Sequence, residues 1–471
     1  MSEKKRRSTN EQTHSPDLPR PDTGRMFDRR HFLGGAALAS LAAPIMSGVG
    51  LAAAPPPPEP KSGDFGEPYL NVRKFGARGD GKTDDTAAIQ RALDAAGKQG
   101  GNVVLLSTGR YLVGSSLHIP IGVTLEGVSR APMSSDGLGR GNGSCLLAVG
   151  GKGKPDGEPL FSLYANSTLC GVSIFYPEQT FPPVEYPWTI RHMPTKISAG
   201  AGNASLVNVL LINPWQGVDF GTYPGGRYYI RGLYGQPLKT GLFIDKCYDV
   251  SRVEDVHFWP FWRNDAKTNS FTTREATAFR IGRADWLYMF NCFAIFYKIG
   301  YHFVHTPSGD PNVLLTQCGT DLGYDMGSLS VKVDACQPWS GISFLNGQFT
   351  GTVEVGKTNS GPVKFTNCGF FAAQPGLVDS NIAVLEGSGL TTFIGCHFGP
   401  SWVRDKKATA LTLRSGRLTV EGCEFSENRR HISLEKGAPA AVITGNHFHG
   451  PAQISNQIGS RAKIGMNIAT G

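Results

Sequence analysis

The sequence predicts an all-β protein, a right-handed parallel β-helix (a solenoid of stacked coils) with a capping helix at its N-terminal end. Three observations predict this fold. The chain of 471 residues holds 60 glycines and 18% charged residues, a composition typical of turn-rich β proteins. A short apolar phrase recurs along the chain, and an amphipathic segment precedes its first occurrence.

The repeated phrase is six residues long and reads apolar, any residue, small residue or Asn, core residue, any residue, apolar. Its core residues are mostly 21 to 29 residues apart, a spacing typical of coils in a solenoid. We therefore expect these residues to form one continuous inward-facing column: Val128, Val172, Val209, Leu233, Val256, Cys292, Cys318, Gly347, Cys368, Cys396, Cys423 and Asn446.

Cysteine is frequent in this column, while the chain's total of nine cysteines is odd. Neighbouring coils lie about 4.8 Å apart, so Cys368, Cys396 and Cys423 should stack as thiols. Coil spacing is unlike the CxxC spacing of zinc sites, so no metal site is expected. The place before the core residue often holds a residue that tolerates the left-handed backbone of a sharp bend: Asn208, Asp255, Asn291, Asn346 and Asn367.

A second strand is expected after each phrase, with one outward residue between two inward residues. The clearest examples are residues 218–220, 242–244, 279–281, 301–303, 329–331 and 411–413. Before the first coil, Thr83-Asp84-Asp85 opens an amphipathic helix that stops at Gly100-Gly101, with Ile89, Leu93 and Ala96 on its apolar face. Such a helix can cover the open end of a solenoid.

The N-terminal region predicts export. Residues 1–54 contain Asp28-Arg29-Arg30-His31-Phe32-Leu33 before a Gly/Ala-rich apolar stretch, the pattern of a twin-arginine signal peptide. Residues 55–63 then form a Pro-rich linker, and residues 64–471 are expected to be a single β-helix domain. The Tat translocase is thus the expected partner during export, and the protein is expected in the periplasm or outside the cell. An uncleaved membrane anchor is the alternative.

The distribution of charge along the chain limits which other partners are expected. The formal net charge is +8, but no dense basic run follows the N-terminal segment, so nucleic acid is not expected as a partner. The oligomeric state stays open.

Residues 71–90, with Asn71-Val72-Arg73-Lys74-Phe75-Gly76-Ala77 followed by Gly79-Asp80-Gly81-Lys82-Thr83-Asp84-Asp85, resemble the opening of pectate-lyase-superfamily proteins. That group includes polygalacturonase-like hydrolases, rhamnogalacturonases and phage tailspike depolymerases. The likeness extends over about residues 70 to 130 and implies a β-helix that acts on a glycan. The Asn-Thr-Asp, Asp-Asp, Gly-His-Gly and Arg-Ile-Lys motifs of polygalacturonases do not occur here in order.

Candidate catalytic residues follow from the strand register. Asp219 and Asp245 should face outward with Cα atoms about 8 Å apart, close to the carboxyl separation of inverting glycosidases, about 6.5–9.5 Å. One carboxyl would protonate the leaving oxygen while the other activates water. Arg280 and His302 occupy the same outward column on the next coils, and Asp249 is a reserve acid.

Candidate substrate-binding residues are aromatic side chains near two loops expected at residues 175–205 and 260–277. Sugar rings stack on aromatic faces, and a cleft with a few polar groups is the usual ligand site. The alternative is core packing or loop cover. The residues assigned to substrate are Trp215, Tyr234, His257, Trp259 and Trp262.

Three functions are consistent with these residues. An inverting glycoside hydrolase acting on a polysaccharide or oligosaccharide needs the acid pair and no cofactor. A polysaccharide lyase acting on a uronate-containing glycan removes the proton next to the carboxylate, and commonly uses Ca²⁺. A non-catalytic glycan-binding β-helix needs only the aromatic groove.

The export prediction can be tested by replacing Arg29 and Arg30 together with lysine. We expect the precursor to stay in the cytoplasm, because twin-arginine recognition needs both guanidinium groups. Cell fractionation with immunoblotting measures this. Undiminished delivery to the periplasm would contradict the signal peptide and favour the membrane anchor.

Overall fold

The computed structural model describes residues 68–133, 143–194, 202–322, 328–371, 381–399 and 409–470. These belong to one compact unit that spans Phe65–Gly471. The predicted signal peptide and Pro-rich linker lie outside the described residues.

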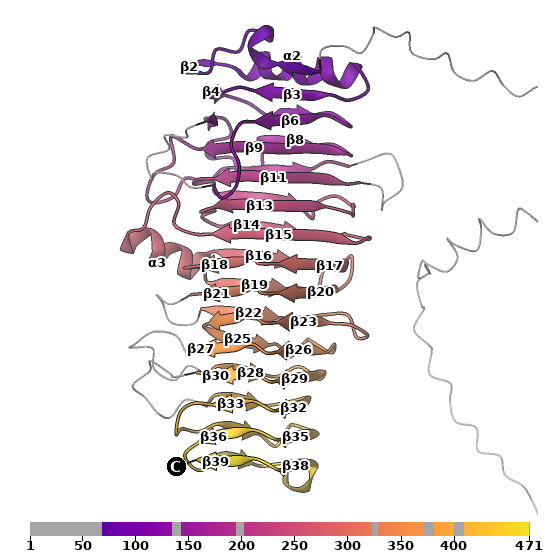
Figure 1. Cartoon of the computed structure of the whole chain (residues 1–471), viewed down its shortest axis with the longest axis vertical. Coiled ribbons are helices and arrows are strands. Elements are labelled where there is room, and N and C mark those ends of the chain that lie inside the picture. The colour runs from indigo at the N-terminus through magenta and orange to yellow at the C-terminus, as the bar shows by residue number, and fades with distance from the viewer. Residues whose placement is uncertain are drawn as a thin grey trace, which may run out of the picture. The chain divides into compact units, whose positions relative to one another are not determined.

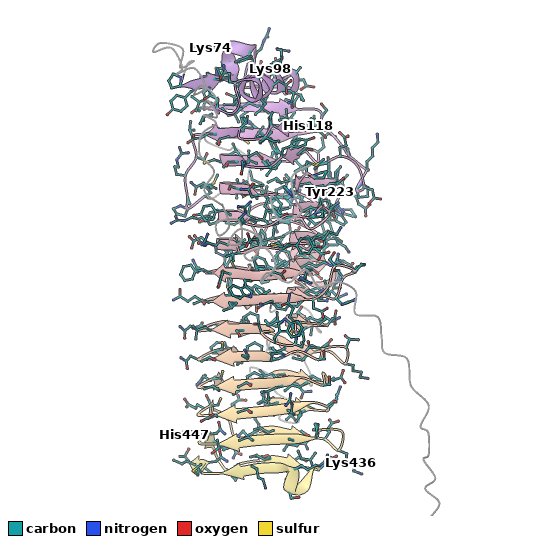
Figure 2. All side chains as sticks on the ribbon, turned by 90° about the vertical axis from the view of Figure 1, so that its right-hand side faces the viewer. Lys74, Lys98, His118, Tyr223, Lys436 and His447 are labelled. Atoms are coloured by element: carbon teal, nitrogen blue, oxygen red, sulfur yellow. The ribbon has the colours of Figure 1, made fainter. Side chains whose placement is uncertain are left out.

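The unit is a right-handed parallel β-helix, as predicted (Figure 1). Among the described residues, strands of neighbouring coils pair in parallel, for example β13 (Tyr229–Gly235) with β15 (Ser251–Phe258) and β14 (Thr240–Ile244) with β16 (Thr277–Ile281). One long sheet, sheet A, bends along its length into a first limb and a second limb, and sheet B closes each coil. Side chains project outward from every coil and are most crowded beside the middle coils, near Tyr223 (Figure 2).

Four strands of sheet A, β9, β11, β13 and β15, continue across the bend from the first limb into the second. The first limb is formed by all the strands that precede the bend. These strands are β1 (Tyr69–Asn71), β3 (Val103–Leu106), β6 (Thr124–Gly127), β9 (Ser167–Phe175), β11 (Ala204–Leu211), β13 (Tyr229–Gly235), β15 (Ser251–Phe258), β17 (Ala284–Phe290), β20 (Pro311–Thr316), β23 (Ile342–Leu345), β26 (Val363–Thr366), β29 (Leu390–Ile394), β32 (Arg417–Glu421), β35 (Ala440–Thr444) and β38 (Ala462–Gly465).

The second limb is otherwise made of separate short strands. These are β2 (Asp80–Asp84), β4 (Gly109–Val113), β7 (Ser144–Ala148), β18 (Phe293–Ile295), β21 (Gly319–Asp321), β24 (Gln348–Thr350), β27 (Gly369–Phe371), β30 (His397–Phe398), β33 (Glu424–Phe425), β36 (His447–His449) and β39 (Ile468–Thr470).

Sheet B contains one strand from every coil except the first, which holds β1 and β2, and the last, which holds β38 and β39. Its strands are β5 (Leu117–Ile119), β8 (Phe161–Leu163), β10 (Trp188–His192), β12 (Gln216–Phe220), β14 (Thr240–Ile244), β16 (Thr277–Ile281), β19 (Ile299–Phe303), β22 (Leu329–Val333), β25 (Thr352–Val355), β28 (Ala383–Leu385), β31 (Leu411–Leu413), β34 (Ile432–Leu434) and β37 (Ile454–Asn456).

The bend between the limbs is made by residues with left-handed backbone. Their φ angles lie between 51° and 69° at Asn208, Gly232, Asp255 and Asn291, and the same region recurs at Asn346 and Asn367. A left-handed backbone costs an ordinary L-residue free energy, and Asn, Asp and Gly tolerate it best. The prediction drawn from Asn and Asp before the core residue is therefore confirmed.

The predicted core column is continuous except at its first member. Val172, Val209, Leu233 and Val256 pair side by side on successive strands. The three stacked cysteines are buried, and the Cys396 N–H donates to Cys423 Sγ at 3.3 Å. All nine cysteines are free thiols.

Val128 is the exception, because 43% of its surface is exposed. The chain leaves the coil after Gly127 and returns at Ser144, the first residue of β7. Cys145 pairs with Ser173, so the register places Ser144 beside Val172, where the sequence predicts Val128.

Helices cover the solenoid at two places. The capping helix is α2 (Thr86–Lys98), which buries Ile89, Leu93 and Ala96 as predicted, and a short 3₁₀ helix, η1 (Val72–Phe75), packs beside it. Helix α3 (Ala266–Glu275) occupies the loop expected at residues 260–277, whereas the loop expected at 175–205 contains strand β10. A second 3₁₀ helix, η2 (Gly459–Arg461), precedes β38. Among the described residues, no helix is long and apolar enough to cross a membrane.

The bend predicts how Asn346 responds to substitution. Asn346 is exposed and has φ 53°, so Asn346→Ala should lower the free energy of unfolding by about 1 kcal/mol through backbone strain alone. Asn346→Gly should leave it nearly unchanged, because glycine has no Cβ to strain. Urea denaturation measures both. Equal losses in the two variants would show that the amide side chain, and not the backbone, matters there.

Candidate functional site

The outer face of sheet B carries the residues predicted to be catalytic. Asp219 lies beside Phe243, Phe243 lies beside Arg280, and, as predicted, Arg280 lies beside His302. The structure continues this column with Lys332, which pairs with His302. The accessibility of its members differs greatly from what the register alone predicts.

Asp219 is fully buried, and the prediction that it faces solvent is wrong. Its Oδ2 accepts a hydrogen bond from Arg191 Nε at 2.6 Å, and the Thr222 hydroxyl donates to the same oxygen at 2.6 Å. Its Oδ1 accepts the backbone N–H groups of Gly221 and Thr222. The carboxylate therefore closes the turn after β12 and cannot reach a glycosidic oxygen.

Asp245 is also buried, with 5% of its surface exposed. Its Oδ1 accepts the backbone N–H of Arg283 at 2.7 Å and the Thr306 hydroxyl at 2.9 Å. These bonds join the turns of successive coils. The predicted inverting pair of Asp219 and Asp245 is therefore wrong, because neither carboxyl is available to a substrate and its water.

Asp249 and Arg280 are accessible, although they lie in different surroundings. Asp249 Oδ1 accepts the N–H of Val250, and its Oδ2 lies 3.8 Å from Arg227 Nε. Arg280 is exposed and forms no ion pair with a described residue. Its guanidinium lies over the Phe243 ring, 5.0 Å from the ring centre.

His302 is held by a carboxylate that the sequence analysis did not assign. Its Nε2 lies 2.7 Å from Asp334 Oδ2, and Lys332 Nζ lies 3.6 Å from Asp334 Oδ1. The hydrogen bond from His302 lowers the pKa of Asp334 below its ordinary value, so this carboxyl stays ionised and orients the imidazole. All three side chains are half-buried.

Lys332 and Asp334 were missed because the strand reading stopped at residue 331. The predicted alternation over 329–331 makes Ser330 the outward residue, but Ser330 is buried and donates to the Thr350 carbonyl. Strand β22 extends to Val333, which places Lys332 in the outward column. Continuing the alternation by two residues would have found it.

Aromatic rings lie beside Arg280 on the same sheet. Trp188 of β10 and Phe243 of β14 are stacked, with ring centres 6.3 Å apart and planes 26° apart. Both rings are half-buried, and Arg280 covers part of Phe243. Trp188 is not among the predicted site residues because the sequence predicts a loop over 175–205, where the structure has β10.

Trp215 and Trp262 do not offer the stacking surface that was predicted. Both are nearly buried. Trp215 packs against Phe271 of α3, and the Arg263 guanidinium lies 4.4 Å above the Trp262 ring. Helix α3 and its preceding loop thus use these rings as packing surface.

Tyr234, His257 and Trp259 lie together, but on sheet A and the loop that leaves it. Tyr234 and His257 pair side by side on β13 and β15, and His257 lies 5.5 Å from the Trp259 ring. Burial lowers the pKa of His257, and its Nε2 has no hydrogen-bond partner among the described residues. The structure therefore separates this cluster from Arg280 and His302 by placing them on different sheets.

No group of three or more His, Cys, Asp or Glu side chains among the described residues is arranged to hold a metal ion.

Comparison with known proteins finds short matches. Residues 69–146 match the family described as rhamnogalacturonase A/epimerase, pectate lyase-like, which agrees with the resemblance of residues 70–130. Alginate lyase 7 of Azotobacter vinelandii is 65% identical over 43 residues, which are 9% of this chain and 5% of that protein. A probable glucan endo-1,3-beta-glucosidase of Arthroderma benhamiae is 42% identical over 59 residues, 12% of this chain and 6% of that protein. The chain thus spans a small part of these relatives.

Several solved structures align with more of the chain, and one example is from the same organism as the alginate lyase. The A-module of mannuronan C-5 epimerase AlgE6 from Azotobacter vinelandii aligns with 85% of this chain over 99% of its own length, at 16% identity and a TM-score of 0.47.

The buried position of Asp219 predicts a structural rather than a catalytic role. Asp219→Asn should lower the free energy of unfolding by about 3 kcal/mol, because it leaves the largely buried Arg191 guanidinium without its counter-charge. Thermal denaturation measures the loss. The exposed Asp156 supplies a control, and Asp156→Asn should change stability by less than about 0.5 kcal/mol. An Asp219→Asn protein that keeps its stability but loses turnover would restore the acid pair.

Proposed function

We propose that this protein is a polysaccharide-active enzyme, and that it cleaves a uronate-containing glycan by β-elimination on the outer face of sheet B. The observation that carries the proposal is the arrangement of an exposed Arg280 beside a His302 imidazole that Asp334 orients. The hydrolase was the first expectation from the sequence. Because the acid pair of Asp219 and Asp245 is buried, we favour the lyase over the hydrolase.

Arg280 is suited to hold the sugar carboxylate. Its guanidinium is exposed and lacks a carboxylate partner among the described residues, while the Phe243 ring supports it from below. Guanidinium groups bind carboxylates through two parallel hydrogen bonds. The same charge stabilises the negative charge that moves onto the carboxylate when the neighbouring carbon loses its proton.

His302 is suited to remove that proton. When Nε2 donates to Asp334, the neutral ring keeps its lone pair on Nδ1, which is then the base. The Asp334 carboxylate also stabilises the imidazolium that forms. This arrangement follows the general rule that a base is oriented by a third group.

Lys332 can complete the reaction. Its ammonium lies beside Asp334 and can donate a proton to the glycosidic oxygen as the bond to the adjacent carbon breaks. The electron pair left on the deprotonated carbon forms a double bond in the ring. The products are one chain with a new reducing end and one with an unsaturated uronate.

The relatives support both the lyase and the hydrolase. One is named an alginate lyase and another a glucan endo-1,3-beta-glucosidase, and the matched segments of both are short. Hydrolysis is therefore the second candidate, and a glycan-binding role without catalysis is the third. We also propose that the protein acts in the periplasm or outside the cell, because residues 28–33 match a twin-arginine signal.

The reaction type can be read from the products. We expect the purified protein to release products that absorb ultraviolet light from at least one of alginate, mannuronan and polygalacturonate. His302→Gln should lower kcat by about 10²–10⁴-fold through loss of the base. Arg280→Gln should raise KM and also lower kcat, because the sugar carboxylate loses its binding partner and the charge that stabilises it as the proton leaves. Absorbance and reducing-end assays measure both.

His305 supplies the matched control. It is an exposed histidine that pairs with Asp310 outside the column, so His305→Gln should keep full turnover. New reducing ends without ultraviolet absorbance would replace the lyase by a hydrolase. Unchanged kcat in His302→Gln would overturn the assigned base.

A further inference from the structure

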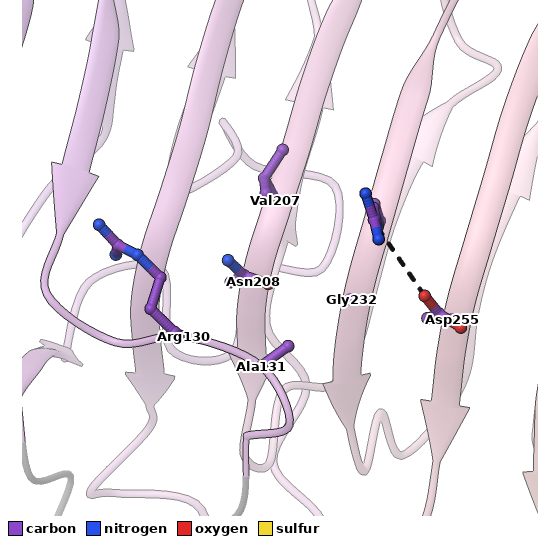
Figure 3. A pocket seen from close by; sticks show the side chains of 7 residues that line it. Arg130, Ala131, Val207, Asn208, Gly232 and Asp255 are labelled. Atoms are coloured by element: carbon purple, nitrogen blue, oxygen red, sulfur yellow. Dashed lines mark ion pairs between the residues drawn. The ribbon is translucent and has the colours of Figure 1, made fainter.

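A cleft lies on sheet A, away from the proposed active site. Its volume is about 320 Å³, and it lies at the bend of β11, β13 and β15, beside the loop that carries Arg130 and Ala131 (Figure 3). It is lined by Arg130, Ala131, Val207, Asn208, Arg231, Gly232 and Asp255.

The cleft is hollow because of the residues that make the bend. Gly232 has φ 69° and no side chain, and a Cβ at this position would lie 3.0 Å from Asn208 Oδ1. The neighbouring coils place short polar side chains, Asn208 and Asp255, at the same position. The bend therefore exposes the polar side chains of Asn208 and Asp255 on both sides of the open position at Gly232.

Charged side chains at and beside the cleft form ion pairs. Arg231 Nε lies 4.0 Å from Glu254 Oε2 and 3.9 Å from Asp255 Oδ2, and Figure 3 shows its pairing with Asp255. Arg130 pairs with Glu126 at 2.7 Å. All of these side chains are at least partly accessible, so they can hydrogen-bond hydroxyl groups from outside.

An exposed aromatic and apolar strip continues from the cleft along the first limb. Glu254 pairs with Phe290 on the next strand, and Arg252 pairs with Tyr288. Phe290 is 45% exposed and Tyr288 40%. The strip consists of Trp286, Tyr288, Phe290, Leu314 and Leu345, on β17, β20 and β23.

This surface matches the chemistry of a pyranose chain. A sugar ring has apolar C–H faces that stack on aromatic rings and hydroxyl edges that bind charged or amide side chains. The strip supplies the rings, the cleft beside it supplies Arg231 and Asp255, and Glu254 lies next to Arg231 on the neighbouring strand. Successive strands are about 4.8 Å apart, comparable with the length of one sugar unit in a chain that crosses them. The interleaved charges make a protein partner the poorer fit, because interface cores are depleted of charge.

We propose that the cleft and strip form a second, non-catalytic binding surface for a polysaccharide chain. The proposal rests on the proposed function in that the bound chain is the polymer cleaved at sheet B. One stretch of polymer is held on sheet A while another reaches Arg280 and His302. The surface therefore favours long polymers over short oligosaccharides.

The test replaces Tyr288 and Phe290 together by threonine, Tyr288→Thr with Phe290→Thr. Threonine stands in the same two outward columns on other coils, at Thr392 and Thr366, so the double variant should fold. We expect affinity for polymer to fall by about tenfold or more through lost stacking. Affinity electrophoresis in gels with alginate, mannuronan, polygalacturonate or β-1,3-glucan measures it, and thermal denaturation checks folding.

Ile394→Thr is the matched control. Ile394 is an exposed residue of the same column as Phe290, four coils beyond it, and the variant should bind polymer as the unaltered chain does. Turnover of short oligosaccharides should be unchanged in the double variant. Retained polymer binding by the double variant, or no binding of any of the four polymers by the unaltered chain, would overturn the proposal. The proposal would also be overturned if the unaltered chain formed a dimer that the Tyr288→Thr, Phe290→Thr variant, but not Ile394→Thr, failed to form.

The two proposals fail separately. His302→Gln removes the proposed base but leaves the strip intact, so it should keep polymer binding in the same gels. Polymer binding that depends on Tyr288 and Phe290 in a protein without lyase activity would sustain this surface and overturn the proposed reaction. Lyase activity together with polymer binding that does not depend on Tyr288 and Phe290 would sustain the proposed reaction and overturn this surface.

Discussion

Parallel backbone pairing between successive coils, in a register kept from one coil to the next, is the constraint on which the remaining structure depends. Neighbouring strands are about 4.8 Å apart, so each side chain lies directly beside its counterparts on the coils above and below. An inward position must then be apolar on every coil, and the bend must recur at the same place. The left-handed Asn, Asp and Gly residues at the bend and the buried cysteines after it satisfy these two demands.

The same register builds the proposed active site. It brings Arg280, His302 and Lys332 from three strands into one outward column, although more than 50 residues separate the first from the last. Turns then decide which members of the column are usable. After β12 the chain turns back, and the Asp219 carboxylate accepts hydrogen bonds from the N–H groups of that turn and pairs with Arg191. After β22 the turn begins with Asp334, which leaves His302 and Lys332 accessible and holds them in place.

A solenoid presents several faces, and its columns can therefore carry separate tasks. Sheet B has a column of cationic and titratable side chains, whereas the first limb of sheet A carries exposed rings beside paired charges. The cysteines are all free thiols, and most of them are buried between these faces, where they pack and hydrogen-bond to the backbone. Burial raises the pKa of Cys247 to about 12, so this thiol stays protonated and unreactive.

The sequence by itself determined the coil repeat, the inward column, the capping helix and the left-handed bend. Each follows from a demand that every coil repeats, so a periodic pattern reveals it. It also determined which outward residues are neighbours, including Arg280 and His302. Only the tertiary structure decided which of them are exposed, because the burial of Asp219, Asp245, Trp215 and Trp262 comes from turns and a helix that follow no period. It also decided that Asp334 orients His302 and that Ala131 lies beside the bend at Gly232, since both arrangements join segments whose separation varies from coil to coil.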